Sequence, residues 1–449
     1  MSLAMDALRR AIGAAGPDFW LRDARAPAAL LAEPPPAAPD AEGLVRLDLR
    51  VTAGRIAAIA PPGTAPAGPE AGPDLDGGQL WPGFVDGHTH LDKGQIWPRS
   101  ANPRGDFAGA LEAAAADRAG WTEADIEARF DFALRAAHAH GTVAIRTHLE
   151  SYGPLSWRVF PRLRDAWAGR ITLQASSIRP LEDFAGGTGQ ALADLVAAEG
   201  GALGMVVQLS GGADAPLPAA LQPQLDRFFT LAEERGLDLD LHVDETGAAG
   251  SRALGAIAMT ALRRGFRGRI QAGHCCSLAM QPEAVARETI RRCAEAGIAV
   301  VVLPMCNLYL QDRAAGRTPR WRGVTLVHEL RAAGIPVSVA SDNTRDPFFA
   351  YGDLDMVEVY REATRILHLD HPVADWPRAA TATPAGVMRL ADRGWLRLGD
   401  AADLVLFRAR GWSEFLARPQ ADRIVLRAGR VLDAEPPDWR ELDAVLGMA

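Results

Sequence analysis

Two histidines at the end of an apolar stretch are the first residues whose types and spacing indicate metal chemistry. His88 and His90 stand two positions apart within residues 81–93, Trp-Pro-Gly-Phe-Val-Asp-Gly-His-Thr-His-Leu-Asp-Lys. In an extended strand, side chains at i and i+2 lie on the same face, so both imidazoles can reach one metal ion. Such a pair also arises by chance in a chain with ten histidines. The prediction therefore depends on whether further ligand-type residues occur at matching positions downstream.

Further histidines and carboxylates come after four other apolar runs, at the point where each run ends. Together with the first pair, these residues are His88, His90, His148, Glu150, His242, Asp244, Glu245, His274, Asp342 and Asn343. In barrels of parallel strands, the C-terminal strand ends meet at one mouth and carry the chemistry. Histidines scattered through a core would not track strand ends in this way. We therefore expect one functional site.

A single divalent ion is expected on four of these side chains, His88, His90, His242 and Asp342. Three neutral imidazoles and one carboxylate leave an open position for water. Such an ion lowers the pKa of water from about 15.7 towards about 7, which generates hydroxide at neutral pH. Asp342 can both bind the metal and accept the proton of that water.

Three further residues receive roles around the ion. His274 can hydrogen-bond the hydroxide or the tetrahedral centre that develops during attack. Glu245 can pass a proton to a ring nitrogen, or it can instead orient a ligand histidine. His148 is expected beside the ligands or facing the substrate rather than on the metal. The remaining histidines are interpreted as surface or helix-end residues.

Lys93 is the only lysine in the chain, and every other basic side chain is arginine. It stands three residues after His90, so its ammonium can donate to a ring carbonyl or an anionic ring nitrogen of a substrate. The alternative is a structural salt bridge to Asp92 or Glu150. A two-metal site bridged by a carbamylated lysine on the fourth strand is excluded, because no lysine stands there. A mononuclear site is therefore predicted.

The elements that must position these residues are expected to be eight strands alternating with helices. The apolar runs are residues 80–91, 142–149, 171–178, 202–209, 237–243, 270–273, 298–304 and 335–340. Helical patterns with capping signals separate most of them, for example residues 122–140 before Gly141. Apolar strands alternating with helices indicate a parallel sheet covered on both faces. Eight units favour an α/β fold of the (β/α)8 TIM-barrel type, and no Gly-x-Gly-x-x-Gly motif indicates a nucleotide-binding sheet.

Both ends of the chain have the character of short strands and turns. Residues 44–51 and 56–60 read as strands, and residues 396–407 and 423–431 repeat the pattern near the other end. We therefore expect residues 1–80 and 391–449 to form one small β domain, split by a barrel of residues 81–390. Residues 1–17 are expected to be a short helix or a disordered arm.

Composition narrows the class of protein. The net charge of −8 argues against binding to nucleic acid or to an anionic membrane. No apolar run reaches the roughly 20 residues of a membrane span, and no secretory signal is recognised at the N-terminus. The four cysteines lack a Cys-x-x-Cys spacing, which favours reduced thiols in a cytoplasmic enzyme. A homo-oligomer is expected.

The chain resembles the amidohydrolase superfamily over residues 19–433. The resemblance rests on Pro-Gly-Phe-Val-Asp-Gly-His-Thr-His-Leu-Asp at residues 82–92, and on residues 242–245, 273–275, 341–343 and 399–404. Residues 146–148, 307–311 and 320–324 are similar to the cytosine deaminase-like branch. Residues 91–93 and 341–346 also resemble N-isopropylammelide isopropylaminohydrolase. The resemblance implies iron or zinc at the site, a split β-sandwich beside the barrel, and expulsion of an amine from a nitrogen heterocycle by water.

Two departures from the cytosine deaminase pattern concern the substrate. Where that branch has a glutamine at the end of strand 3, this chain has Ser-Ser-Ile-Arg with Ile178, and a tryptophan after the strand-8 aspartate is replaced by Phe348. A missing hydrogen-bond partner in such a pocket changes substrate preference by orders of magnitude. The candidate substrate contacts are Lys93, His148, Ile178, Asn343 and Phe348.

The leading hypothesis is a hydrolytic deaminase of a small pyrimidine- or triazine-like ring, which releases ammonia or an amine. A cyclic amidase that opens a ring amide is the first alternative. It is distinguished from a deaminase because it would release neither ammonia nor an amine. A catalytically silent binding protein on the same fold is the second. Silent relatives usually lose strand-end ligands, and none is lost here.

Overall fold

The computed structural model describes residues 3–66 and 72–448 of the chain. The chain divides into two compact units. The first consists of Met1–Asp86, Arg135–Ala144 and Asp355–Pro436, and the second of Gly87–Leu134, Ile145–Leu354 and Pro437–Ala449. Every strand-end residue of the expected site belongs to the second unit.

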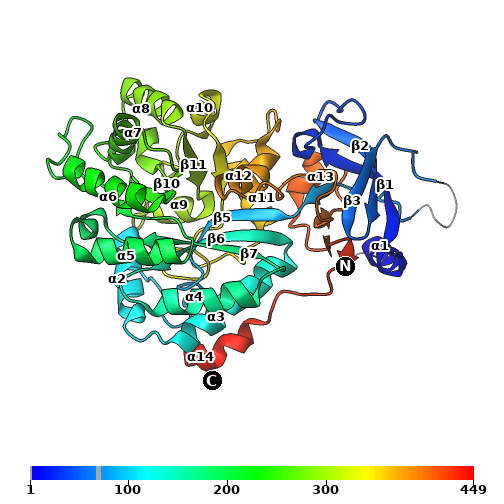
Figure 1. Ribbon diagram of the computed structural model, residues 1–449, viewed down its shortest axis with the longest axis horizontal. Helices are drawn as coiled ribbons and strands as arrows, with labels where there is room; N and C mark the ends of the chain where they lie inside the picture. Colours follow the sequence, from blue (N-terminus) through cyan, green and yellow to red (C-terminus); the bar gives the residue numbers. More distant parts are fainter. Residues whose placement is uncertain (1–2, 67–71, 449) are drawn as a thin grey trace. The chain divides into compact units, whose positions relative to one another are not determined.

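Within the described residues, eight strands form two sheets that together make a barrel (Figure 1). One sheet has the order β5-β6-β7 and the other β12-β11-β10-β9-β8, and the pairs from β8 to β12 are parallel. Isolated bridges join the open edges, Ser176 to Ala202 and Thr89 to Asp342. The strands are β5 (Phe84–Thr89), β6 (Thr142–Glu150), β7 (Thr172–Ile178), β8 (Val206–Val207), β9 (Leu239–Val243), β10 (Ile270–His274), β11 (Ile298–Val302) and β12 (Val337–Val339). The predicted TIM-barrel-like α/β fold is confirmed.

Most of the barrel strands are buried along nearly their whole length, which explains their near-continuous apolar sequences. All five residues of β9, of β10 and of β11 are buried. A strand that is covered on both faces has no need for alternating polar residues. The polar exceptions are therefore informative, and Asp240 and His242 in β9 are the clearest of them.

Helices connect the strands on the outside of the barrel. Figure 1 shows α5 to α8 side by side in green, and each of these helices packs against the next. The helices of this part of the chain are α2 (Phe107–Arg118), α3 (Glu123–Ala139), α4 (Leu155–Ala166), α5 (Gly187–Ala198), α6 (Leu221–Arg235), α7 (Ala253–Arg264), α8 (Glu283–Glu295), α9 (Pro304–Leu310), α10 (Val327–Ala332) and α14 (Asp443–Leu446). Short 3-10 helices lie at Leu181–Ala185, Cys276–Met280 and Trp439–Leu442.

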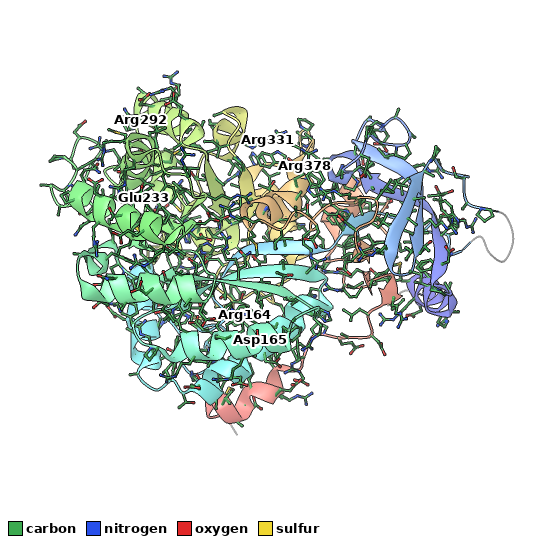
Figure 2. All side chains as sticks on the ribbon, viewed as in Figure 1. Arg164, Asp165, Glu233, Arg292, Arg331 and Arg378 are labelled. Atoms are coloured by element: carbon green, nitrogen blue, oxygen red, sulfur yellow. The ribbon has the colours of Figure 1, made fainter. Side chains whose placement is uncertain are left out.

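Charged side chains project from these outer helices, as Figure 2 shows for Arg164, Glu233 and Arg292. Glu233 accepts a hydrogen bond from Arg264 at 3.0 Å, and Arg292 donates to Glu288 at 2.7 Å. Exposed pairs of this kind typically contribute about 0–1 kcal/mol each. The stability of the barrel therefore comes from its buried apolar strands and helix faces.

The first unit contains two antiparallel sheets built from both ends of the chain. One has the order β1-β2-β3 and the other β15-β14-β13-β4, so a strand from the N-terminal part pairs with strands from the C-terminal part. Apolar side chains of both sheets, among them Leu49 and Leu404, belong to one core cluster. The strands are β1 (Asp18–Pro27), β2 (Leu44–Thr52), β3 (Arg55–Ala60), β4 (Leu80–Pro82), β13 (Leu404–Leu406), β14 (Ile424–Arg427) and β15 (Arg430–Val431).

The helices of this unit begin with α1 (Leu3–Ala14), so the expected N-terminal segment is helical in its described part. The others are α11 (Met356–Leu367), α12 (Ala382–Val387) and α13 (Trp412–Ala417), with 3-10 helices at Ala28–Leu30 and Trp376–Ala380. Across residues 3–66 and 72–448, no helix combines the length and apolar character that a bilayer crossing requires.

A buried ion pair in the first unit gives a stability prediction. Arg423 donates to both carboxylate oxygens of Asp355 at 2.6 Å. Burial raises the pKa of Asp355, but the charge and hydrogen bonds of Arg423, with smaller contributions from His140 and the Val357 N–H, together outweigh burial and lower this pKa to about 2. The pair therefore stabilises the fold fully above the unfolded pKa of roughly 3.9, and this contribution is lost as the pH falls towards 2. Arg423→Met should reduce the free energy of unfolding at neutral pH by about 3–5 kcal/mol in urea denaturation. A loss below 1 kcal/mol would contradict this reading of the pair.

Candidate metal centre and active site

The strand ends of the barrel bring the expected metal ligands to one mouth. His88 lies in β5 and His90 comes just after it, whereas His242 lies in β9 and Asp342 comes after β12. The bridge between Thr89 and Asp342 sets the last of these beside the first strand. All four side chains are buried, with exposures of 0–5%.

Three of the distances within this set match those between neighbouring ligands of one metal ion. Asp342 Oδ1 lies 3.5 Å from His88 Nε2 and 3.3 Å from His90 Nε2, and His90 Nε2 lies 3.3 Å from His242 Nε2. Ligand atoms on a tetrahedron around zinc, with bonds of 2.0–2.1 Å, stand about 3.4 Å apart. The described residues therefore form a buried His/Asp cluster able to hold a divalent ion.

The hydrogen bonding of the cluster also fits a metal. Neither oxygen of Asp342 and neither ring nitrogen of His88 has a hydrogen-bond partner. Buried polar atoms without partners are costly, and a cation would satisfy these. Burial lowers the pKa of His90 and of His242 well below the ordinary value, which keeps both imidazoles in the neutral form that binds metals. Burial alone would raise the pKa of Asp342, but its close contacts with His88, His90 and His274 together outweigh burial and hold the carboxyl ionised.

His148 lies in the same cluster, but it also has a carboxylate partner. Its Nε2 lies 3.3 Å from Asp240 Oδ1, and a ligand atom of His148 is within 4.8 Å of those of His88, His90 and His242. Burial lowers the pKa of His148 to about 4. Asp240 thus holds His148 beside the metal ligands, as expected for a residue next to the ligands. Ligation of the metal by His148 itself stays the alternative.

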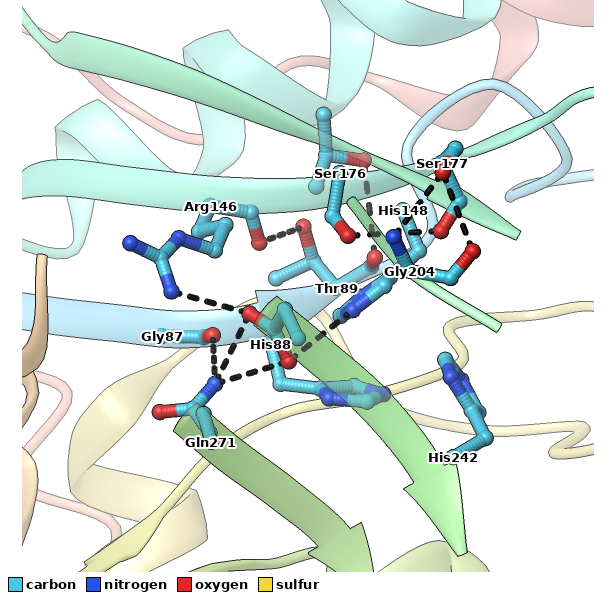
Figure 3. A network of polar contacts seen from close by, with 12 residues as sticks. Gly87, His88, Thr89, Arg146, His148, Ser176, Ser177, Gly204, His242 and Gln271 are labelled. Carbon is cyan, nitrogen blue, oxygen red and sulfur yellow. Dashed lines mark hydrogen bonds and ion pairs between the residues drawn. The ribbon is translucent and has the colours of Figure 1, made fainter. Parts of the chain in front are cut away.

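Asp240 is a site residue that the sequence reasoning missed. Its carboxylate accepts hydrogen bonds from Arg146 Nη1 at 2.9 Å and from Gln271 Nε2 at 3.0 Å, besides its contact with His148 (Figure 3). It stands two positions before His242 in β9, so both side chains point to the same face of the strand. The same i, i+2 rule that found the first histidine pair would have found it.

Glu245 and His274 lie next to each other, and the Asn307 side chain contacts both. Glu245 Oε1 lies 3.3 Å from His274 Nδ1, and it accepts a hydrogen bond from Asn307 Nδ2 at 3.2 Å. Asn307 Nδ2 is also 3.0 Å from His274 Nδ1. Burial, together with repulsion from Asp342, raises the pKa of Glu245 well above its usual value. Asn307 on α9 was quoted for the resemblance and was not expected to contact these two residues.

Several residues at the strand ends have left-handed backbone conformations. Asp244, His274, Cys275 and Asp342 have φ values of 52°, 67°, 50° and 62°. Non-glycine residues in this region cost of order 1–3 kcal/mol each and gather at functional sites. Asp244 does not face the metal cluster; its carboxylate accepts hydrogen bonds from Ser251 Oγ at 2.6 Å and from two N–H groups at the start of α7. It thereby fixes the turn that presents Glu245.

Comparison with known proteins decides the family. The amidohydrolase family is matched over residues 172–433. A pterin deaminase of Rhizobium rhizogenes (strain K84 / ATCC BAA-868) is 53% identical over 414 residues, which cover 91% of this chain and 93% of the relative. This chain belongs to the amidohydrolase family. The resemblance stated from the sequence is confirmed.

Two solved structures share the fold of this amidohydrolase. A 5-methylcytosine deaminase from Klebsiella pneumoniae, liganded with 5-fluorocytosine, has a TM-score of 0.77 at 22% identity and covers 94% of this chain and 98% of its own. N-isopropylammelide isopropylaminohydrolase from Burkholderia multivorans ATCC 17616 has a TM-score of 0.71 at 25% identity and covers 93% and 98%. The barrel with its strand-end cluster is thus an amidohydrolase barrel.

Beside the cluster of this amidohydrolase lies Lys93, which is buried with 4% exposure. In the described part of the chain its ammonium lies 4.1 Å from the centre of the Phe348 ring, with no carboxylate within ion-pair distance. Of the expected alternative partners, Glu150 pairs with Arg118 at 2.6 Å, and Asp92 accepts a hydrogen bond from the N–H of Glu150 on Oδ2, while its Oδ1 has no hydrogen-bond partner. The geometry therefore favours the substrate-contact hypothesis over the structural salt bridge.

The other three candidate substrate contacts, Phe348, Asn343 and Ile178, have different neighbours. Phe348 is held by its N–H, which donates to Asp346 Oδ1 at 2.8 Å, and Asn343 Nδ2 lies 3.5 Å from Cys306 Sγ. Ile178 ends β7, where its N–H donates to Ser151 Oγ at 3.4 Å. The structure thus brings Lys93 and Phe348 together, and it places the Asn343 side chain against the thiol of Cys306.

Proposed function

We propose that this amidohydrolase is a mononuclear metal-dependent deaminase of a pterin or a closely related bicyclic heterocycle. The observation that carries the proposal is the extent of identity with the pterin deaminase of Rhizobium rhizogenes. A pterin carries an amino group on C2 of its pyrimidinone ring, so the substrate class narrows the pyrimidine- or triazine-like ring expected from the sequence. Hydrolysis replaces that amino group by oxygen, consumes one water and releases one ammonia.

In this proposal His88, His90, His242 and Asp342 hold one iron or zinc ion. Three contacts support this assignment, those of Asp342 with His88 at 3.5 Å and with His90 at 3.3 Å, and that of His90 with His242 at 3.3 Å. Among the described residues, neither oxygen of Asp342 has a hydrogen-bond partner, which also supports it. A divalent ion supplies Lewis-acid chemistry there, because it lowers the pKa of water to near neutrality. Asp342 is ionised and can accept the proton that the attacking water loses.

Glu245 serves as the proton donor to the heterocycle. Burial and the charge of Asp342 raise the pKa of the Glu245 carboxyl well above the usual value, which favours the protonated form, and Asn307 and His274 fix the position of its Oε1. It can give this proton to the ring nitrogen next to the amino-bearing carbon while water oxygen bonds to that carbon. The proton that Asp342 accepted from the water then passes to the leaving amine, which departs as ammonia when the carbon–nitrogen bond breaks.

Ammonia release from pterin, with parallel measurement of the 2-oxo product, tests the proposed function on enzyme reconstituted with one metal. We expect ammonia and lumazine in equal amounts from pterin, and much slower release from cytosine because the edge contact at Ile178 is missing. Ring-opened product without ammonia would replace the proposal by the cyclic amidase. Failure to turn over any pterin in metal-loaded enzyme would overturn the substrate class.

Lys93 is proposed to contact the oxo group or the anionic ring nitrogen of the substrate. Lys93→Met should lower kcat/KM by about 2–4 kcal/mol, roughly 30- to 1000-fold, because a buried polar edge of the substrate loses its partner. Lys93→Arg should rescue little, since a planar guanidinium does not replace a compact ammonium beside Phe348. Metal content, measured on the same preparations, should be unchanged. Near-normal turnover of the arginine variant would assign Lys93 a structural role.

The finer organisation of the protein is also proposed. Residues 1–80 and 391–449 would form a small β-sandwich domain, with residues 81–390 as the catalytic barrel, and the pairing of β4 with β13 supports the joining of both chain ends. The two compact units draw the limits elsewhere, because Asp355–Pro436 belongs to the first unit and Pro437–Ala449 to the second. Four free, buried cysteines support a reducing, cytoplasmic location. A homo-oligomer stays a prediction that light scattering on the purified enzyme would test.

A further inference from the structure

A second set of possible metal ligands lies beside the His/Asp cluster. Glu245, Cys306 and Asp342 each offer one ligand atom, and these three atoms lie within 4.8 Å of one another. They come from three separate strand ends: Glu245 lies after β9, Cys306 lies in the first turn of α9 after β11, and Asp342 lies after β12. The set shares Asp342 with the first cluster, and a thiol takes the place of the imidazoles.

The atoms of this second set have few partners of their own. Asp342 is 1% exposed and neither of its oxygens accepts a hydrogen bond. Cys306 is fully buried, and its Sγ contacts Phe348 O at 3.9 Å and Asn343 Nδ2 at 3.5 Å and also interacts with Asp342. The contacts of Glu245 with Asn307 and His274 both use Oε1. Oε2 of Glu245, the thiol and the Asp342 oxygen that the first ion does not use can therefore share one common partner.

The chemistry of this partner can be derived from the charges and the sulfur. Two carboxylates close together in a buried site repel each other, and in the described structure Lys93 lies outside ion-pair distance of both. A divalent cation offsets that repulsion, and a sulfur ligand selects zinc, cobalt or cadmium over magnesium. Around zinc, with Zn–S of 2.3 Å and Zn–O near 2.1 Å, sulfur and oxygen ligands stand about 3.6 Å apart. Side-chain adjustments of about 1 Å bring these three atoms to that spacing.

We infer that Glu245, Cys306 and Asp342 form a second, inhibitory site for a thiophilic divalent ion, occupied when that ion exceeds one equivalent per chain. On binding, Cys306 gives up its proton to solvent and the sulfur becomes a ligand. Glu245 likewise gives up its carboxyl proton to solvent and its carboxylate becomes a ligand, so it can no longer exchange a proton with a heterocycle. Binding of the second ion depends on the geometry alone; its inhibitory effect rests on the proposed function.

The test titrates Co²⁺ and then Zn²⁺ into holoenzyme that already holds one ion per chain. Wild type is compared with Cys306→Ala, with Cys306→Ser as a variant of nearly equal size, and with Cys293→Ala as matched control. Cys293 is also a fully buried thiol, but it lies on α8 and belongs to neither ligand set. The readouts are ions bound at equilibrium dialysis, the near-ultraviolet thiolate-to-cobalt charge-transfer band, and ammonia release relative to each variant's own value at one equivalent.

Wild type and Cys293→Ala should bind a second cobalt, develop the thiolate band and lose activity as that ion binds. Both Cys306 variants should lack the band, and the zinc concentration for half inhibition should rise at least about tenfold, since even losing a ligand's hydrogen-bond partner costs 10- to 100-fold in metal affinity. Magnesium should not inhibit.

A single bound ion in wild type at excess cobalt, or a second ion and band that persist in the Cys306 variants, would overturn the inference. A second ion with the thiolate band in an enzyme that deaminates no pterin would leave the site standing and overturn the proposed function instead. The two failures are thus distinguishable on the same preparations.

Discussion

Replacing Glu245 with glutamine is expected to lower kcat by about 10²- to 10⁴-fold while the metal stays bound. Glutamine keeps the shape of the side chain and can still contact Asn307 and His274, but it has no proton to deliver. The loss should appear mainly in kcat, because a proton transferred during the reaction contributes little to binding in the ground state. Steady-state kinetics with metal analysis of the same sample measures both quantities.

Glu150→Gln is the matched control for this experiment. Glu150 is a carboxylate at the end of another barrel strand, β6, and is largely buried like Glu245, but its partner is Arg118 at 2.6 Å. The control should retain activity within a few-fold. If the Glu245 variant also stayed within a few-fold of wild type, Glu245 would be restricted to positioning His274 and Asn307.

Removal of the His88 imidazole is expected to abolish activity through loss of the metal. His88 is fully buried, and both its ring nitrogens lack hydrogen-bond partners in the protein. His88→Ala would remove one of four ligands and leave the carboxylate of Asp342 poorly compensated in the interior. Metal content should fall from about one ion per chain to near zero, and activity should fall with it.

His371→Ala controls for the loss of a histidine as such, since the His371 side chain is 92% exposed. It should keep its metal and its activity. Full metal occupancy in His88→Ala would remove His88 from the ligand set and would favour His148, whose ligand atom lies in the same cluster.

Much of the barrel could be predicted because burial on both faces leaves a strong mark on sequence. The runs at residues 237–243, 270–273 and 298–304 correspond to β9, β10 and β11 within a few residues. The fourth run, residues 202–209, yields only Val206–Val207 as regular strand. Gly204 explains the difference, because a Cβ there would lie 2.0 Å from the carbonyl oxygen of Ser177. Such close approach of two backbones is a tertiary contact that hydrophobic periodicity does not record.

The ligand candidates could be found because ligands must be specific residue types at strand ends. Their partners could not, because those contacts join distant positions. Asp240 meets Arg146 across 94 residues of sequence, and Asn307 reaches Glu245 across 62. The role of Asp244 was also hidden, since its carboxylate at a strand end faces Ser251 rather than the metal cluster. Only the folded barrel separates a carboxylate that fixes a turn from one that exchanges protons.

The most direct test of the account is the dependence of pterin deamination on the number of metal ions bound per chain. Chelated enzyme is reloaded stepwise with iron or zinc, and ammonia release and bound metal are measured on each sample. The account predicts no turnover without metal and a linear rise that ends at one ion per chain, with decline only when a thiophilic ion is in excess. Turnover by metal-free enzyme, or activity that requires two ions per chain, would contradict it.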